Sequence, residues 1–105
     1  MKIVSWNIRG LGTNGKVEVI NRLVKIQGAN VCFLQETKLV NVSEVFVRRI
    51  WGDDNFDFRF VAAVGRSGGL ITIWDKSSFI MKKEYRSNRF IVLEGIWCVE
   101  GWEGF

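Results

Sequence analysis

The sequence predicts a mixed α/β domain of the α+β kind, in which two helices alternate with the first two strands and more strands follow. Three observations support this. Apolar residues make up 48% of the 105 residues, which is enough for a core. Apolar positions recur with helical spacing in two early segments, and from about residue 56 they recur at every second residue. No repeat or linker divides the chain, so one domain is expected over residues 1–105.

The first half of the chain predicts the order strand, helix, strand, helix. Residues 2–8 are β-branched and aromatic and are followed by glycines, as expected of a strand that ends in a turn. A helix is expected over residues 15–27, with Thr13 or Asn14 as its cap and Gly28 at its end. Its apolar residues fall mostly on one face, so this helix should pack against a sheet.

Residues 31–36 form a continuous apolar run, which is the pattern of a strand covered on both faces. Cys32 lies inside this run, so we expect it to be a buried, reduced thiol. Ser43 is expected to cap a second helix that extends to about Trp51.

The second half predicts strands joined by glycine-, serine- and asparagine-rich turns, with no proline anywhere in the chain. The strands are expected at residues 56–60, 70–74, 79–85 and 90–97, with turns at 65–69 and 86–89. Residues 99–105 are typical of a hairpin whose return strand has barely begun. Aromatic sheet faces would then lack a covering layer, so we expect either a missing part of the domain or another chain to cover them.

The formal charge is +4, from 15 basic and 11 acidic residues. This surplus suits an anionic partner such as nucleic acid, and it is equally compatible with an ordinary basic surface. Two cysteines without any histidine do not make a zinc site. No signal peptide is recognisable, and no apolar run approaches the roughly 18–20 residues of a membrane span. We therefore expect an intracellular protein of the nucleus or cytoplasm.

Two polar stretches follow the first two predicted strands. Asn7 ends the first, and Glu36 with Lys38 follows the second. Parallel strands joined by one helix would bring Asn7 and Glu36 together at the sheet edge where sites of α/β proteins lie. A carboxylate there suits Mg²⁺, an amide can hold a phosphate oxygen or a metal ligand, and a lysine adds charge for a phosphate. The alternative is structural: Glu36 pairs with Lys38, and Asn7 forms a turn.

Four motifs in order along the chain carry a family resemblance: SWNIRGLG, FLQETKL, WGDDNFDF and GRSGGLITIWD. Together they resemble the endonuclease/exonuclease/phosphatase superfamily, which includes deoxyribonuclease I and the abasic-site endonucleases. The nearest resemblance is to the endonuclease domain of plant LINE-type (non-LTR) retrotransposons and their reverse-transcriptase-associated relatives. The IVLEGIW strand also takes part, so the resemblance extends over the whole chain.

The resemblance implies a four-layer α/β/β/α sandwich of the deoxyribonuclease I-like type, of which residues 1–105 would be the N-terminal half. It also implies Mg²⁺-dependent cleavage of DNA phosphodiesters, with Mn²⁺ as a possible substitute. In the family pattern Glu36 is a metal ligand, and Asn7 contacts phosphate or supports the metal shell. Residues expected to line a phosphate track are Arg9, Lys38, Arg66 and Ser67.

The later half of the family pattern also includes an Asp-x-Asn pair, an Asp-His pair and a catalytic tyrosine, and this chain is expected to match only the earlier half. It contains no histidine, and Tyr85 lies in the wrong strand to be that tyrosine. The chain alone is therefore expected to be inactive. Two further interpretations are open: a non-catalytic retroelement remnant that binds nucleic acid weakly at most, and an unrelated α/β binding module in which Asn7 and Glu36 are structural.

Overall fold

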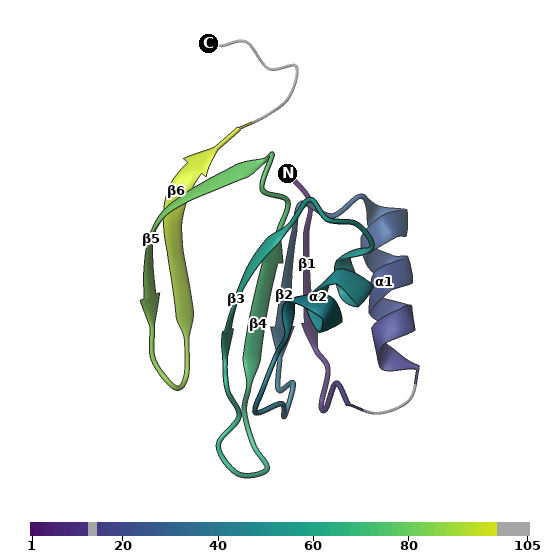
Figure 1. The fold of residues 1–105 in the computed structure, drawn as a ribbon, viewed down its shortest axis with the longest axis vertical. Coiled ribbons are helices and arrows are strands. Elements are labelled where there is room, and N and C mark those ends of the chain that lie inside the picture. Colours follow the sequence, from purple (N-terminus) through teal and green to yellow (C-terminus); the bar gives the residue numbers. More distant parts are fainter. Residues whose placement is uncertain (13–14, 99–105) are drawn as a thin grey trace.

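The computed structural model describes residues 1–12 and 15–98, and its elements follow the expected order (Figure 1). The elements are β1 (Ile3–Asn7), α1 (Lys16–Gln27), β2 (Val31–Gln35), α2 (Glu44–Trp51), β3 (Asp57–Val61), β4 (Leu70–Trp74), β5 (Phe79–Arg86) and β6 (Ile91–Trp97). The prediction of a mixed α/β fold with two helices is confirmed. Residues 99–105, expected to begin a hairpin, lie outside the described residues.

The strands form two sheets. In the first, the order is β1-β2-β4-β3, with β1 parallel to β2 and the other neighbours antiparallel. The second is the antiparallel hairpin of β5 and β6. Figure 1 shows α1 and α2 on one face of the four-stranded sheet and the hairpin on the other. The described residues thus form three layers, with helices, sheet and hairpin in succession.

Local signals set the ends of both helices. Gly28 and Gly52 terminate α1 and α2 in the left-handed conformation, as glycine allows. Ser43 caps α2, because its hydroxyl oxygen accepts a hydrogen bond from the amide of Phe46 (3.1 Å), as expected from the sequence. The N-cap position of α1 is Gly15, while Thr13 and Asn14, expected to cap this helix, lie outside the described residues.

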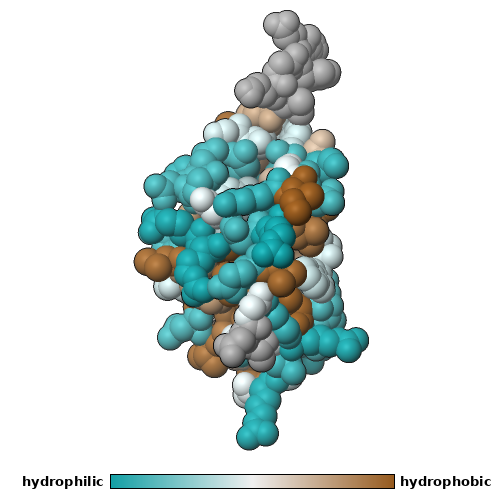
Figure 2. Space-filling model, turned by 90° about the vertical axis from the view of Figure 1, so that its right-hand side faces the viewer, coloured by the Kyte–Doolittle hydropathy of each residue, from teal (hydrophilic) through white to brown (hydrophobic). Residues whose placement is uncertain are grey.

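The main core lies between the helices and the sheet. Seen from the helix side, the molecule is mostly hydrophilic with scattered apolar spots, because the apolar stripes of the helices face inward (Figure 2). The helix residues buried in this core are Val17, Ile20 and Val24 of α1 and Val47, Ile50 and Trp51 of α2. Cys32 of β2 lies among them as a free thiol, and burial raises its pKa to about 12.

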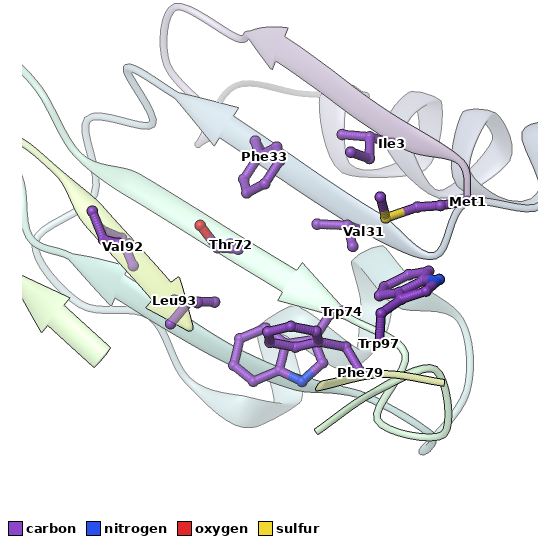
Figure 3. A pocket seen from close by; sticks show the side chains of 11 residues that line it. Met1, Ile3, Val31, Phe33, Thr72, Trp74, Phe79, Val92, Leu93 and Trp97 are labelled. Atoms are coloured by element: carbon purple, nitrogen blue, oxygen red, sulfur yellow. The ribbon is translucent and has the colours of Figure 1, made fainter. Parts of the chain in front are cut away.

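The opposite face of the sheet is less well covered. An apolar cavity of about 390 Å³ separates it from the hairpin, and side chains from both layers point into it (Figure 3). Phe33 of β2 remains 36% exposed there, so the expectation that its strand is covered on both faces is wrong. The reason is that the hairpin stands off from β1 and β2, whereas it contacts the sheet at Trp74, whose ring meets that of Phe79 edge to face at 6.0 Å, and at β3 through Arg59 and Glu84. No helix in the described ranges is long and apolar enough to cross a membrane.

Candidate functional site

The candidate site lies where β1 and β2 end. Asn7 is the register partner of Gln35, and its side-chain amide donates a hydrogen bond to Glu36 Oε2. The prediction that Asn7 and Glu36 lie side by side is therefore confirmed. In residues 1–12 and 15–98 no ion pair joins Glu36 to Lys38, so the structural alternative in which these two residues pair is wrong.

The backbone around this pair has an unusual conformation. Arg9, Glu36 and Lys38 have φ values of 52°, 52° and 59°, and they are the non-glycine residues with positive φ in the described part of the chain. Each such residue costs roughly 1–2 kcal/mol and needs compensation from its surroundings. All three belong to the two stretches that the sequence singled out, so backbone strain is concentrated at the candidate site.

Main-chain hydrogen bonds between the two stretches supply part of that compensation. The amide of Ile8 donates to the Gln35 carbonyl (2.9 Å), and the amide of Gly10 donates to the Glu36 carbonyl (2.7 Å). The amide of Leu11 donates a third bond to the Thr37 carbonyl (2.9 Å). The two loops therefore stay paired beyond the strands and hold Asn7 against Glu36.

Lys16, the first residue of α1, provides a second support. Its ammonium donates to three consecutive carbonyls, those of Ile8 (2.9 Å), Arg9 (3.2 Å) and Gly10 (2.9 Å). An ammonium group has three donors, so all of them are used. The bonds fix the turn in which Arg9 has positive φ, and they connect the helix to the loop that follows Asn7.

A strap of Gly68 and Gly69, just before β4, closes the other side. The amides of Thr37 and Lys38 donate to the carbonyls of Gly69 (3.1 Å) and Gly68 (2.9 Å). Thr37 is almost fully buried beneath the strap, at 1% exposure. The loop that carries Glu36 is therefore held between the continuation of β1 and the glycine strap.

The site opens into a cavity of about 360 Å³. The residues that line it are Asn7, Gln35, Glu36, Gly68, Gly69, Leu70, Asn88 and Arg89. Figure 1 shows the turn between β5 and β6 at the same end of the molecule as the ends of β1 and β2. This turn brings Asn88 and Arg89 to Glu36, so the lining combines one carboxylate with one guanidinium among the described residues.

Sequence reasoning missed Asn88 and Arg89 as site residues and treated them only as a turn. The available signal was a turn flanked by arginines, RSNR, in a chain expected to bind an anion. Four of the predicted phosphate contacts are exposed and lie outside the lining of this cavity: Arg9, Lys38, Arg66 and Ser67. Their contact with phosphate stays a prediction.

The oxygen ligands at the site are of the type that a hard divalent cation binds, but they are too few to surround one. Glu36 offers a carboxylate and Asn7 an amide oxygen, the oxygen ligands that Mg²⁺ prefers, and Mg²⁺ keeps several waters. Within the described ranges no group of three or more His, Cys, Asp or Glu side chains could enclose a metal ion. The residues present could thus hold a cation from one side.

Removing the Lys16 ammonium should loosen the loop that follows Asn7. We expect Lys16→Met to lower the free energy of unfolding by about 1–3 kcal/mol, because three carbonyls lose a charged donor. Urea denaturation measures this loss. The control is Arg22→Met on the exposed face of the same helix, expected to change stability by less than about 0.5 kcal/mol. Equal effects of the two substitutions would contradict a specific role of Lys16.

Comparison with known proteins identifies solved structures of similar fold. No protein-family model matches the chain, and no curated protein matches it. Among solved structures, the AP endonuclease LMAP from Leishmania major aligns with a TM-score of 0.51 and 26% identity, over 71% of this chain and 24% of that one. The catalytic domain of Xenopus laevis APE2 aligns with a TM-score of 0.55 and 24% identity, over 81% of this chain and 26% of that one.

The chain is similar in fold to AP endonucleases. These enzymes belong to the deoxyribonuclease I-like superfamily, so the resemblance read from the motifs is supported at that level. The chain spans about a quarter of the length of the two solved structures.

Proposed function

We propose that this chain carries the metal- and phosphate-binding part of a deoxyribonuclease I-like site that acts on DNA. The observation that carries the proposal is the Asn7–Glu36 pair at the ends of two parallel strands, with Arg89 in the lining of the same cavity. The similarity in fold to AP endonucleases supports it. A carboxylate suits a cation and a guanidinium suits a phosphate, so the cavity has complementary groups for a metal-bound phosphodiester.

In this proposal Glu36 holds Mg²⁺, or Mn²⁺ in its place, and Asn7 orients the Glu36 carboxylate while its own oxygen faces the ligand. A bound cation would supply charge that stabilises the anionic phosphate during cleavage. The chain's own residues bind and orient: Glu36 and Asn7 on one wall, and Arg89 on the other. The exposed side chains of Arg9, Lys38 and Arg66 would add phosphate contacts along the DNA.

We further propose that the 105 residues alone bind DNA without cleaving it. A nuclease of this type needs a group that moves a proton to or from the attacking water, and such groups typically contribute 10²–10⁴-fold in rate. The sequence contains no histidine, and Glu36 is the one titratable acid that lines the cavity in the described ranges. From the motifs we also propose a closer relation to retrotransposon endonuclease domains. That relation concerns the origin of the chain and does not alter this chemistry.

Glu36→Ala should abolish cation binding at the cavity. Mn²⁺ broadens the NMR signals of nearby amides, so in the unchanged protein we expect the signals of Gly68 and Gly69 to broaden selectively, and in the variant to stay sharp. Glu94→Ala removes an exposed carboxylate from the hairpin and serves as the matched control, expected to leave the broadening unchanged. Broadening that survives in Glu36→Ala would overturn the assignment of Glu36.

Incubation with supercoiled plasmid DNA and Mg²⁺ tests whether the 105 residues cleave DNA. We expect no nicking above the background given by Glu36→Ala. Robust nicking by the unchanged chain that disappears in Glu36→Ala would show that the 105 residues are a complete nuclease, and the proposed lack of cleavage would then be wrong.

A further inference from the structure

A cluster of charged side chains joins the hairpin to the edge of the four-stranded sheet. The Glu84 carboxylate of β5 contacts two guanidinium groups, that of Arg59 on β3 (2.6 Å) and that of Arg86 on β5 (2.8 Å). Arg59 also pairs with Asp57 (3.1 Å), and its guanidinium carbon lies 5.6 Å from the centre of the Trp74 ring. The Glu84 carboxylate thus connects β5 of the hairpin to β3 of the four-stranded sheet.

The same cluster continues to the main chain of β3. Arg86 Nη1 donates to the Phe60 carbonyl (3.1 Å), so the last residue of β5 is attached to β3 directly as well as through Glu84. The turn follows at once, closed by a bond from the Ser87 amide to the Phe90 carbonyl (3.1 Å). Arg89 of the candidate site is therefore three residues from an anchored position.

A second contact between hairpin and sheet lies far from this turn. The aromatic contact of Trp74 with Phe79 lies at the opposite end of the hairpin, where β5 begins. Between the two ends lies the apolar cavity of Figure 3, where the two layers do not pack closely. Of the ion pairs, hydrogen bonds and ring contacts that join the two layers in the described residues, those of the charged cluster therefore lie nearest to the turn.

The cluster is also partly shielded from solvent. The Arg59 and Glu84 side chains are 24% and 28% exposed, less than those of the Arg48–Asp54 pair on the surface (45% and 84%). The hydrogen bond from Arg59 lowers the pKa of the Glu84 carboxyl, so Glu84 stays ionised at neutral pH. Its contribution is present above the ordinary glutamate pKa and is lost as the pH falls through the lowered one.

We propose that Glu84, by bridging Arg59 and Arg86, is a positioning residue that holds the β5–β6 turn and its Arg89 over the Asn7–Glu36 cavity. The expected effect of Glu84 on DNA binding rests on the proposed function, in which Arg89 is the phosphate contact that Glu84 puts in place. Glu84 itself touches no ligand.

The position of the turn can be measured without DNA. A nitroxide attached to Asn88→Cys, in a Cys98→Ser background because Cys32 is buried, should broaden the amide signals of Gly68 and Gly69 across the cavity. Adding Glu84→Gln should weaken this broadening clearly. Unchanged broadening in the Glu84→Gln protein would overturn the proposal whether or not the chain binds DNA.

Binding of a short DNA duplex, followed by fluorescence anisotropy at several salt concentrations, tests the consequence. Arg89→Ala should weaken binding roughly three- to tenfold and reduce the slope of log K against log salt by about 0.9, the value for one lost phosphate contact. Glu84→Gln should do the same and should have no further effect when combined with Arg89→Ala. A general loss of folded protein would lower the apparent affinity without changing this slope.

The sign of the effect separates positioning from simple charge. Glu84→Gln removes a negative charge, so a Glu84 that only repels DNA would give tighter binding in the variant, and that result would overturn the proposal. Asp54→Asn breaks the exposed Arg48–Asp54 pair instead and should leave both the affinity and the slope nearly unchanged. If the unchanged chain does not bind the duplex at all, the proposed function fails, and the nitroxide measurement alone decides the role of Glu84.

Discussion

Gly69→Ala should destabilise the fold by about 3 kcal/mol and displace the loop that carries Glu36. Two costs add. Gly69 has a φ of +92°, where a side chain costs roughly 1–2 kcal/mol. A methyl group there would also overlap Thr37 Oγ1 and lie 3.0 Å from the Lys38 amide nitrogen, and overpacking of this kind typically costs about 1–3 kcal/mol. Thr37 is buried and hydrogen-bonded to the strap, so it has little freedom to move away.

The neighbouring residue provides the control for this prediction. Gly68 has a φ of +81°, and a methyl group there would meet nothing within 4 Å. Gly68→Ala therefore carries the backbone cost alone, about 1 kcal/mol. Urea denaturation of both variants measures the difference, and NMR shifts of the Glu36 and Thr37 amides report the displacement. If the two variants lose the same stability, close contact between the strap and Thr37 is not what makes Gly69 necessary.

Trp74→Ala should have the largest effect of any single truncation, a loss of about 3–5 kcal/mol. Trp74 is the largest of the fully buried side chains, at 1% exposure. Its ring meets Phe79 edge to face, and Arg59 lies over it at 5.6 Å, so its removal leaves a cavity and separates the hairpin from β4. Because small domains have only about 5–15 kcal/mol of stability, a large unfolded fraction is expected at 37 °C.

Thermal unfolding followed by circular dichroism measures the loss. Trp97→Ala is the matched control: it removes an indole from the same apolar cavity, but Trp97 is only partly buried and should cost less than half as much. Trp74→Phe should recover part of the stability, because a phenyl ring fills part of the cavity. If Trp74→Ala and Trp97→Ala lower the stability equally, the contact between Trp74 of β4 and Phe79 is not the main attachment of the hairpin.

Much of the fold could be predicted because its signals are local. Ser43 caps its helix, Gly28 and Gly52 end theirs, and the change of apolar spacing near residue 56 marks the start of the antiparallel strands. The Asn7–Glu36 pair was equally accessible to prediction. Once residues 2–36 are read as strand, helix and strand, parallel pairing places the ends of both strands at one edge.

Other features depend on contacts between residues far apart in the chain. Phe33 lies among apolar neighbours in the sequence, and no local pattern indicates that the hairpin leaves its ring 36% exposed. The glycine pair before β4 reads as an ordinary turn until its carbonyls are seen to accept from Thr37 and Lys38, about 31 residues earlier. Lys16 likewise reads as a solvent-facing helix residue until its three carbonyl partners are known.

The two-helix α/β order and the Asn7–Glu36 wall of the candidate site could be predicted from the sequence, because capping, apolar spacing and the connection between parallel strands are local properties. The opposite wall depends on contacts that form only in the folded molecule. Arg89 comes to the cavity because a hairpin folds back across the sheet and is held there by Arg59 and Glu84, which are 25 residues apart. The direction in which a hairpin folds depends on such long-range contacts, and a sequence pattern does not encode them.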